Sequence, residues 1–161
     1  MSAPSSWLPA AAEDAMTTSL RQHFKPLMLP PAAEEWLLML WQAIQVFDDY
    51  ADGDEVPRDA LNATIWNTLV AMPQNPFFAQ HAGTLLPLLS AMILKWQASD
   101  HVERLKEASA KSYMWRAGYY ELVLASVQLV HGPAAATAVA HQVLGMYGET
   151  LEDYMKEFGN A

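Results

Sequence analysis

One predicted helix, at residues 31–52, constrains the fold more than any other segment, because its residues 36–47 are apolar around nearly the whole circumference. The segment starts at Pro30-Pro31, which suits the first turn of a helix, and it stops before Gly53, which readily takes the left-handed conformation that terminates helices. A helix that is apolar on every side has to be covered on every side. The sequence therefore predicts a helical bundle around a buried central helix at 31–52.

Proline and glycine divide the rest of the chain into further helical segments. An Asp100/Glu103 capping box is expected to start the longest of them, and Gly132-Pro133 to end it. No stretch alternates apolar and polar residues between hairpin turns, so no strand is predicted. We expect an all-α, single-domain bundle of six to seven helices over residues 9–161, after a flexible N-terminus at 1–8. Besides 31–52, the predicted helical segments are 10–24, 57–72, 76–81, 85–98, 100–131, 133–146 and 150–158.

The charge balance narrows the classes of partner. The 161 residues include 18 Asp and Glu against 9 Lys and Arg, which gives a net charge of −9. Nucleic-acid binding needs clustered cations, so we expect no nucleic-acid partner. The absence of cysteine excludes disulfides and thiolate metal sites. Neither a signal peptide nor a membrane-spanning apolar run is predicted, and we expect a cytoplasmic protein with no membrane partner.

An acidic cluster at the end of the predicted central helix is the first candidate site. Asp48 and Asp52 lie one turn apart on one face with Asp49 beside them, and Asp54 and Glu55 follow. Carboxylates are unfavourable at a helix C-terminus, so a cation should offset them. Oxygen ligands suit Mg²⁺ or Ca²⁺, and we predict a metal site at Asp48, Asp49 and Asp52. A solvated cap and turn, or an internal salt-bridge network, are the alternatives.

Arg116 is the second candidate, because a guanidinium is unusual among so many aromatic residues. A buried arginine has to be paired, and the acidic cluster is its predicted partner. Arg116, with Tyr120 and Lys111, would then bind a phosphate or carboxylate ligand. Alternatively, the Arg116 side chain reaches solvent along the surface.

Asp48-Asp49-Tyr50-Ala51-Asp52 resembles the DDxxD motif of isoprenoid diphosphate and terpene synthases. That resemblance implies Mg²⁺ held against a diphosphate, with a second acidic motif among Glu149, Glu152, Asp153 and Glu157. Residues 48–59 also resemble a calcium-binding EF-hand loop with Gly53 at its sixth position. Over most of the chain, Phe47–Asp54, Met72–Phe78 and Trp115–Leu122 resemble small helical proteins of tailed phages, which implies no particular activity.

Two functional hypotheses follow, and the sequence leaves open whether the protein is an enzyme. The first is a divalent-metal carboxylate site that binds or acts on a phosphate or diphosphate ligand. The alternative is a non-enzymatic, acidic protein-interaction module of phage or bacterial origin. Its partner would bind an aromatic surface around Trp7, Phe77 and Phe78, where loops are expected to expose apolar groups. The oligomeric state is not predicted.

Overall fold

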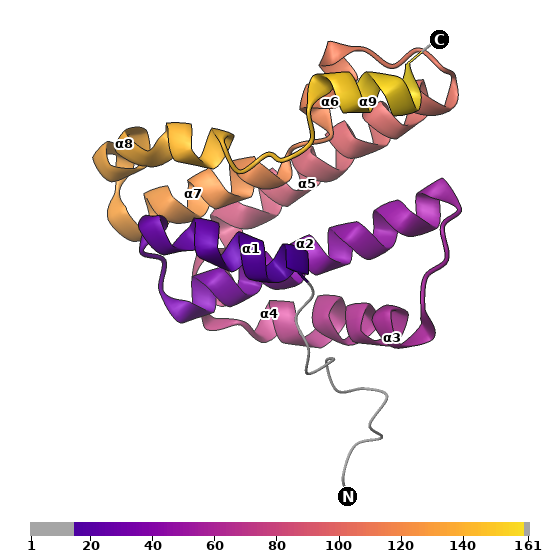
Figure 1. Cartoon of the computed structure of the whole chain (residues 1–161). Coiled ribbons are helices and arrows are strands. Elements are labelled where there is room, and N and C mark those ends of the chain that lie inside the picture. Colours follow the sequence, from indigo (N-terminus) through magenta and orange to yellow (C-terminus); the bar gives the residue numbers. More distant parts are fainter. Residues whose placement is uncertain (1–14, 160–161) are drawn as a thin grey trace, which may run out of the picture. The chain divides into compact units, whose positions relative to one another are not determined.

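The computed structural model describes residues 15–159, and every regular element in that range is helical. The predicted all-α class is therefore confirmed. Figure 1 shows the order of the elements along the chain. Seven helices have eight residues or more: α1 (Ala15–Phe24), α2 (Pro31–Asp52), α3 (Arg58–Trp66), α5 (Pro76–Arg104), α7 (Tyr119–His131), α8 (Pro133–Leu144) and α9 (Leu151–Phe158). The shorter elements are η2 (Lys25–Leu27), the π-helical η3 (Asn67–Ala71), α4 (Met72–Gln74) and α6 (Ala110–Trp115).

The chain forms two compact units, which are described here one at a time. Unit 1 runs to His81 and unit 2 begins at Ala82, so the boundary falls inside α5. The predicted flexible N-terminus at 1–8 and the predicted helix start at residue 10 lie outside the described residues.

In unit 1, α1 packs against α2, and the path α3–η3–α4 returns along α2 (Figure 1). Phe24, Trp36 and Leu37 are fully buried between these helices. Asn75 closes the unit with both ends of its amide: its Oδ1 accepts from the Phe78 N–H at 3.1 Å, and its Nδ2 donates to a carbonyl of α2 at 2.9 Å. Asn75 is therefore the N-cap of α5 that its position before Pro76 predicts.

The predicted central helix is α2, with both ends where the sequence places them. Gly53 has φ of 77°; its N–H donates to the Tyr50 carbonyl, and the next N–H, of Asp54, donates to the Asp49 carbonyl at 2.9 Å. These two bonds form a Schellman motif, which requires a left-handed residue at position 53. The burial of α2 is concentrated between Ala33 and Ala43, and its last turns expose apolar side chains.

The prediction that Phe77 and Phe78 form an exposed aromatic surface is wrong. Phe77 is buried, and the Phe78 ring stacks on Trp36 with 5.4 Å between the ring centroids. The chain continues through these positions as the first turn of α5, which points the rings inward instead of leaving them on a loop. Trp7 lies outside the described residues.

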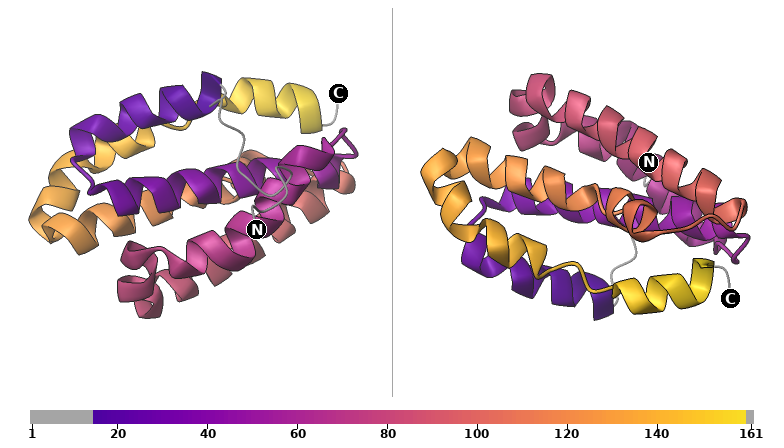
Figure 2. Two further views of the ribbon diagram at one scale, coloured as in Figure 1. Left: turned by 90° about the horizontal axis from the view of Figure 1, so that it is seen from below. Right: turned by 90° about the horizontal axis from the view of Figure 1, so that it is seen from above.

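In unit 2, α7 and α8 form a helical hairpin around Gly132, which has φ of 88° (Figure 2). The core of this unit contains fully buried Leu122, Val123 and Val143. Tyr154 of α9 is also fully buried, and α9 packs on α6. The predicted break at Gly132-Pro133 is confirmed.

Two predicted boundaries in α5 are wrong. The segments at 76–81 and 85–98 are parts of one helix that continues to Arg104. Pro87 lies inside this helix, where its ring crowds the carbonyl four residues earlier, which belongs to Gly83. The other backbone hydrogen bonds of a 29-residue helix keep it continuous at this point.

The predicted helix at 100–131 is also wrong, because the chain breaks twice inside it. The Asp100/Glu103 pair lies within α5 and starts nothing. The capping box of the structure is Ser109 with Ser112, at the start of α6. A second break at 116–118 separates α6 from α7, and Gly118 fits against α5 so closely that a Cβ would come within 2.9 Å of Met92.

Candidate functional site

The three aspartates of the predicted metal site lie in the last two turns of α2. Asp48 and Asp49 are half-buried and Asp52 is exposed. The carbonyl of Asp49 is already committed to the Schellman motif, while Asp48 and Asp52 both have interaction partners in the structure. The geometry of the cluster is thus that of a helix end followed by a tight turn.

Within residues 15–159, no three His, Asp or Glu side chains lie together in an arrangement that could hold a metal ion. The proposed set of Asp48, Asp49 and Asp52, with Mg²⁺ or Ca²⁺ as the cofactor, therefore stays a prediction from sequence. So does the pairing of Arg116 with these aspartates.

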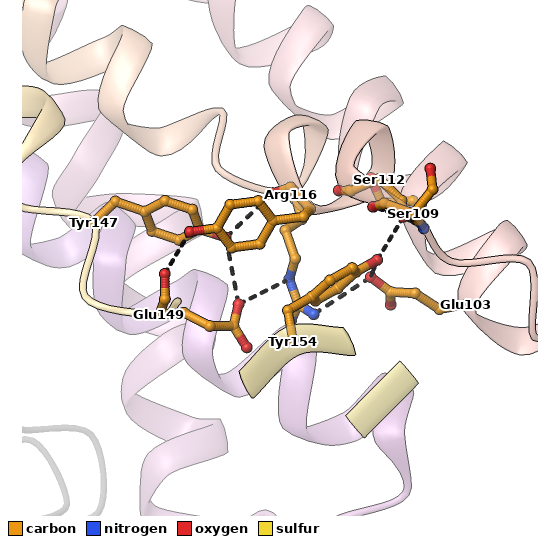
Figure 3. A network of polar contacts seen from close by, with 9 residues as sticks. Glu103, Ser109, Ser112, Arg116, Tyr147, Glu149 and Tyr154 are labelled. Carbon is orange, nitrogen blue, oxygen red and sulfur yellow. Dashed lines mark hydrogen bonds and ion pairs between the residues drawn. The ribbon is translucent and has the colours of Figure 1, made fainter. Parts of the chain in front are cut away.

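Arg116 is the centre of the polar network that unit 2 builds (Figure 3). It lies at the break between α6 and α7, where the chain leaves one helix before it starts the next. Its Nη1 lies 3.3 Å from Oε1 of Glu103, and its Nε lies 4.0 Å from Oε2 of Glu149. The side chains of Arg116 and Glu103 are only 14% and 8% exposed, so this ion pair is largely shielded from water.

Helix α9 places two aromatic rings on the guanidinium. The Arg116 Cζ lies 5.3 Å from the centre of the Tyr154 ring and 4.9 Å from that of Phe158. Both distances are within the range of cation–π attraction. Arg116 is therefore held by carboxylates and aromatic faces together, and the predicted excursion of its side chain to the surface does not occur.

A chain of hydroxyl groups extends the network from Glu103 to the start of α6. The hydroxyl of Tyr154 lies 3.0 Å from Oε1 of Glu103 and 2.6 Å from Oγ of Ser112. One phenol has one hydrogen, and an ionised carboxylate can only accept. Tyr154 therefore donates to Glu103, and the one hydrogen of Ser112 is shared between the Tyr154 oxygen and the Ser109 carbonyl, which lies 2.9 Å from Ser112 Oγ. The Ser112 oxygen also accepts the Ser109 N–H at 2.9 Å.

Further tyrosines surround the second carboxylate. Tyr113 donates to the backbone carbonyl of Glu149 at 2.5 Å, and the Tyr147 hydroxyl lies 3.3 Å from the Glu149 carboxylate. The rings of Tyr113 and Tyr147 stack at 5.0 Å. Burial, and secondly the charge of Glu149, raise the pKa of Tyr147 far above its usual range.

Burial also raises the pKa of two other hydroxyls of the cluster. The pKa values of Tyr120 and Tyr154 both rise to about 12. For Tyr154, the bond from Ser112 opposes this rise, and the bond to Glu103 reinforces it. All of these phenols are therefore neutral at pH 7 and act as hydrogen-bond donors, not as bases.

Of the three residues predicted to bind an anionic ligand, Arg116 and Tyr120 belong to this cluster and Lys111 does not contribute its ammonium group. The Tyr120 hydroxyl donates to the Met146 carbonyl at 3.3 Å. Lys111 is exposed and enters the α6 cap through its backbone N–H, which donates to Ser109. The sequence did not single out Glu103 as a partner of Arg116, and it named Glu149 only as a candidate metal ligand.

Chemically, the network joins the C-terminal helix to the rest of unit 2. The carboxylates of Glu103 and Glu149 pair with the Arg116 guanidinium. The hydroxyls of Tyr154 and Tyr147 hydrogen-bond to these same two carboxylates. A buried, hydrogen-bonded ion pair of this kind fixes one arrangement of its surroundings more than it provides reactive groups. We therefore assign the network a structural role in positioning α9.

The second unusual feature of unit 2 is the outer face of α5. Leu86, Ile93 and Leu94 are 53%, 47% and 63% exposed. Gly83, Pro87, Ser90, Ala91, Gln97 and Ala98 complete this face, and all of them are exposed. The opposite side of the helix holds the buried residues Leu85, Met92 and Ser99, so α5 is apolar on both sides. We call these nine exposed residues the α5 outer face; Thr84, which is also exposed, lies at its edge.

All of the α5 outer face except Gln97 and Ala98 lies in a part of the chain that has no Asp, Glu, Lys or Arg, which extends from residue 60 to residue 94. In the part of the chain that the structure describes, α5 is also the one helix long and apolar enough to cross a membrane by length and composition. Only 17% of its most apolar 18-residue window is buried. The exposed area of α5 is thus both apolar and uncharged.

Comparison of the chain with models of protein families, with curated protein sequences and with solved structures found no significant match.

Proposed function

We propose that this protein is a non-enzymatic interaction module that binds a protein partner through the α5 outer face. The observation that supports the proposal most directly is the exposure of Leu86, Ile93 and Leu94 on an uncharged helix face. Single exposed apolar residues are ordinary, but contiguous apolar patches mark sites of interaction.

The free energy left unused on this face is considerable. Burying a leucine or isoleucine side chain fully contributes about 1.5–3 kcal/mol. Three such side chains that are about half exposed thus leave roughly 2–4 kcal/mol available to an interface. That free energy equals the contribution of one or two of the residues that dominate binding in known interfaces.

A protein surface suits this face better than a lipid bilayer. Helices that lie on membranes usually have Lys and Arg beside their apolar face, which bind the anionic headgroups. Here no cation occurs between Arg58 and Lys95, and the chain has a net charge of −9 that anionic lipids would repel. The inner side of α5 is also engaged in its own unit, where Ser99 donates to the Ser112 carbonyl at 3.0 Å.

The proposal is tested by affinity capture from cells with one variant in the face and one outside it. Leu94→Glu places a charge in the middle of the α5 outer face, and we expect it to abolish capture of the partner. Leu144→Glu is the matched control, because Leu144 is 76% exposed on α8 and lies outside the face. A partner that is captured equally by both variants would show that another surface binds it.

A further inference from the structure

We infer that the α5 outer face binds the same face of a second copy of this chain, with the two helices antiparallel and crossing at Ser90. This inference rests on the proposed function and names the partner. A small-residue stripe alone would not identify that partner. Three features do: the charges beside the face, the absence of charge within it, and the placement of its two leucines.

The charges beside the face are neutralised inside each copy. Lys95 forms an ion pair with Glu121 of α7, and Arg104 pairs with Asp100 at 3.0 Å. Neither end of the face therefore presents a net charge that would attract an acidic or a basic partner. A surface without net charge is matched by another of the same kind, because a lone charge buried against it would be left unpaired.

The distribution of charge along α5 also selects the direction of pairing. The helix has no Asp, Glu, Lys or Arg before Lys95, and all of its ionised residues follow in its last third. Parallel helices would place Lys95 and Arg104 against the same residues of the second copy. Antiparallel helices place these ion pairs opposite the uncharged half of the partner helix, so that the ion pairs of the two copies do not have to pack against each other.

Ser90 lies midway between the two leucines of the face, so the face can pair with itself about that residue. Leu86 and Leu94 lie one turn before and one turn after it, and Gly83 and Gln97 lie two turns away on the same line. In an antiparallel pair centred on Ser90, Leu94 lies opposite Leu86 of the second copy, and Ile93 lies opposite Pro87. This is the self-complementary pattern that a two-fold interface requires.

Glycine at position 83 permits the close approach of the two helices. A Cβ placed there would meet nothing within 4 Å in one copy, so the space beside it is open to a partner. The face has nine residues along about 24 Å of helix, whereas stable interfaces use about 20–30 residues per partner. We therefore expect a weak, concentration-dependent dimer.

Sedimentation equilibrium of the full chain over about 1 to 500 μM is the first test, a range that suits weak association. We expect the wild type and Leu144→Glu to dimerise, and Leu94→Glu to stay monomeric with an unchanged circular dichroism spectrum. Gly83→Ala should weaken dimerisation while it stabilises the monomer, because alanine favours a helix over glycine and finds open space. If Leu94→Glu fails to fold, Gly83→Ala alone decides.

Disulfide trapping tests the register, since the chain contains no cysteine of its own. Under oxidation, Ser90→Cys should form a covalent dimer by itself. Gly83→Cys and Gln97→Cys should form one only when the two variants are mixed, which a parallel pair would not produce.

Three outcomes would overturn the inference. A wild type that remains monomeric at every concentration excludes the second copy as partner, whereas the capture experiment with Leu94→Glu still tests the proposed function. A dimer that persists in Leu94→Glu uses another surface. Flotation of the wild type with phosphatidylcholine vesicles, lost in Leu94→Glu and retained in Leu144→Glu, would assign the face to a membrane.

Discussion

Removing the charge of Arg116 should destabilise the protein far more than removing an exposed arginine does. In Arg116→Met, the guanidinium disappears and Glu103, which is 8% exposed, loses its cation. Loss of one partner from a buried ion pair costs about 3–5 kcal/mol, because the remaining charge is left uncompensated. Glu103 keeps the bond from Tyr154, so we expect the lower end of this range, about 3 kcal/mol. For a chain of this length, the corresponding fall in Tm is roughly 6–12 °C.

The matched control is Arg104→Met in the same unit. Arg104 also pairs with a carboxylate, at 3.0 Å from Asp100, but its side chain is 68% exposed. Such surface pairs on one helix contribute only ~0.3–0.5 kcal/mol. Two variants with the same chemical change should therefore differ about sixfold or more in their effect on the free energy of unfolding.

Urea denaturation followed by far-ultraviolet circular dichroism measures both variants, provided that the transition is two-state and the m-values agree. The double variant Arg116→Met/Glu103→Gln adds a second readout. Because it removes the orphaned charge, it should be more stable than Arg116→Met alone. If Arg116→Met costs no more than Arg104→Met, the Arg116–Glu103 pair does not stabilise unit 2, and the structural role assigned to the network is refuted.

Three other predictions concern the network, two helix ends and the aspartates. The folded-state pKa of Tyr154 is about 12, above the ordinary ~10 of a tyrosine. The contribution of Tyr154 to stability is therefore complete below pH ~10 and is lost as the pH rises toward 12. Urea titrations from pH 9 to 12, a range set by these pKa values, should show a smaller loss in the free energy of unfolding for Tyr154→Phe than for the wild type. Lys106 has φ of 59°, so Lys106→Gly should raise the free energy of unfolding by about 0.5–1 kcal/mol. Gly53 has φ of 77°, so Gly53→Ala should lower the free energy of unfolding by about 1 kcal/mol. Equal effects of the two variants in thermal denaturation would contradict the assignment of both residues as left-handed helix ends. For the aspartates, a divalent-metal site predicts binding heat with Mg²⁺ or Ca²⁺ that disappears in Asp48→Asn, and a flat calorimetric titration of the wild type would exclude it.

The helix ends that the sequence predicts well are those set by local backbone chemistry. Gly53 and Gly132 both take positive φ, and Asn75 caps the helix that follows it. Each of these residues acts on its own neighbours within a few positions, so its effect can be read without knowledge of the fold.

The helix ends that were predicted wrongly depend on packing instead. Nothing next to Leu105 breaks a helix in the sequence, yet α5 ends there with Lys106 in a left-handed conformation. Conversely, Gly83 signals a break that a long, well-bonded helix overrides. Hydrogen bonds and contacts made elsewhere in the unit decide these positions, and such tertiary contacts routinely outweigh local propensity.

The network around Arg116 shows how far reasoning about a single residue extends. An arginine among aromatic residues correctly signalled a paired guanidinium. Its partners could not be found in the same way, because Glu103 and Glu149 are brought to it by the two breaks on either side of α6. Since the sequence predicts one continuous helix there, it places Glu103 almost four turns from Arg116 instead of in contact with it.

The distribution of charged residues along the sequence, and not the net charge, indicates where a partner surface lies. All 27 ionised side chains, 18 acidic and 9 basic, lie outside residues 60–94. The same stretch supplies exposed Leu61, Ile65 and Leu69 as well as the three exposed apolar side chains of the α5 outer face, Leu86, Ile93 and Leu94. Exposed apolar residues favour association, while a net charge of −9 on the rest of the chain opposes the approach of a second copy. For the dimer proposed above, the acidic residues would limit how strongly the α5 outer face associates, and added salt, which screens them, should strengthen that association.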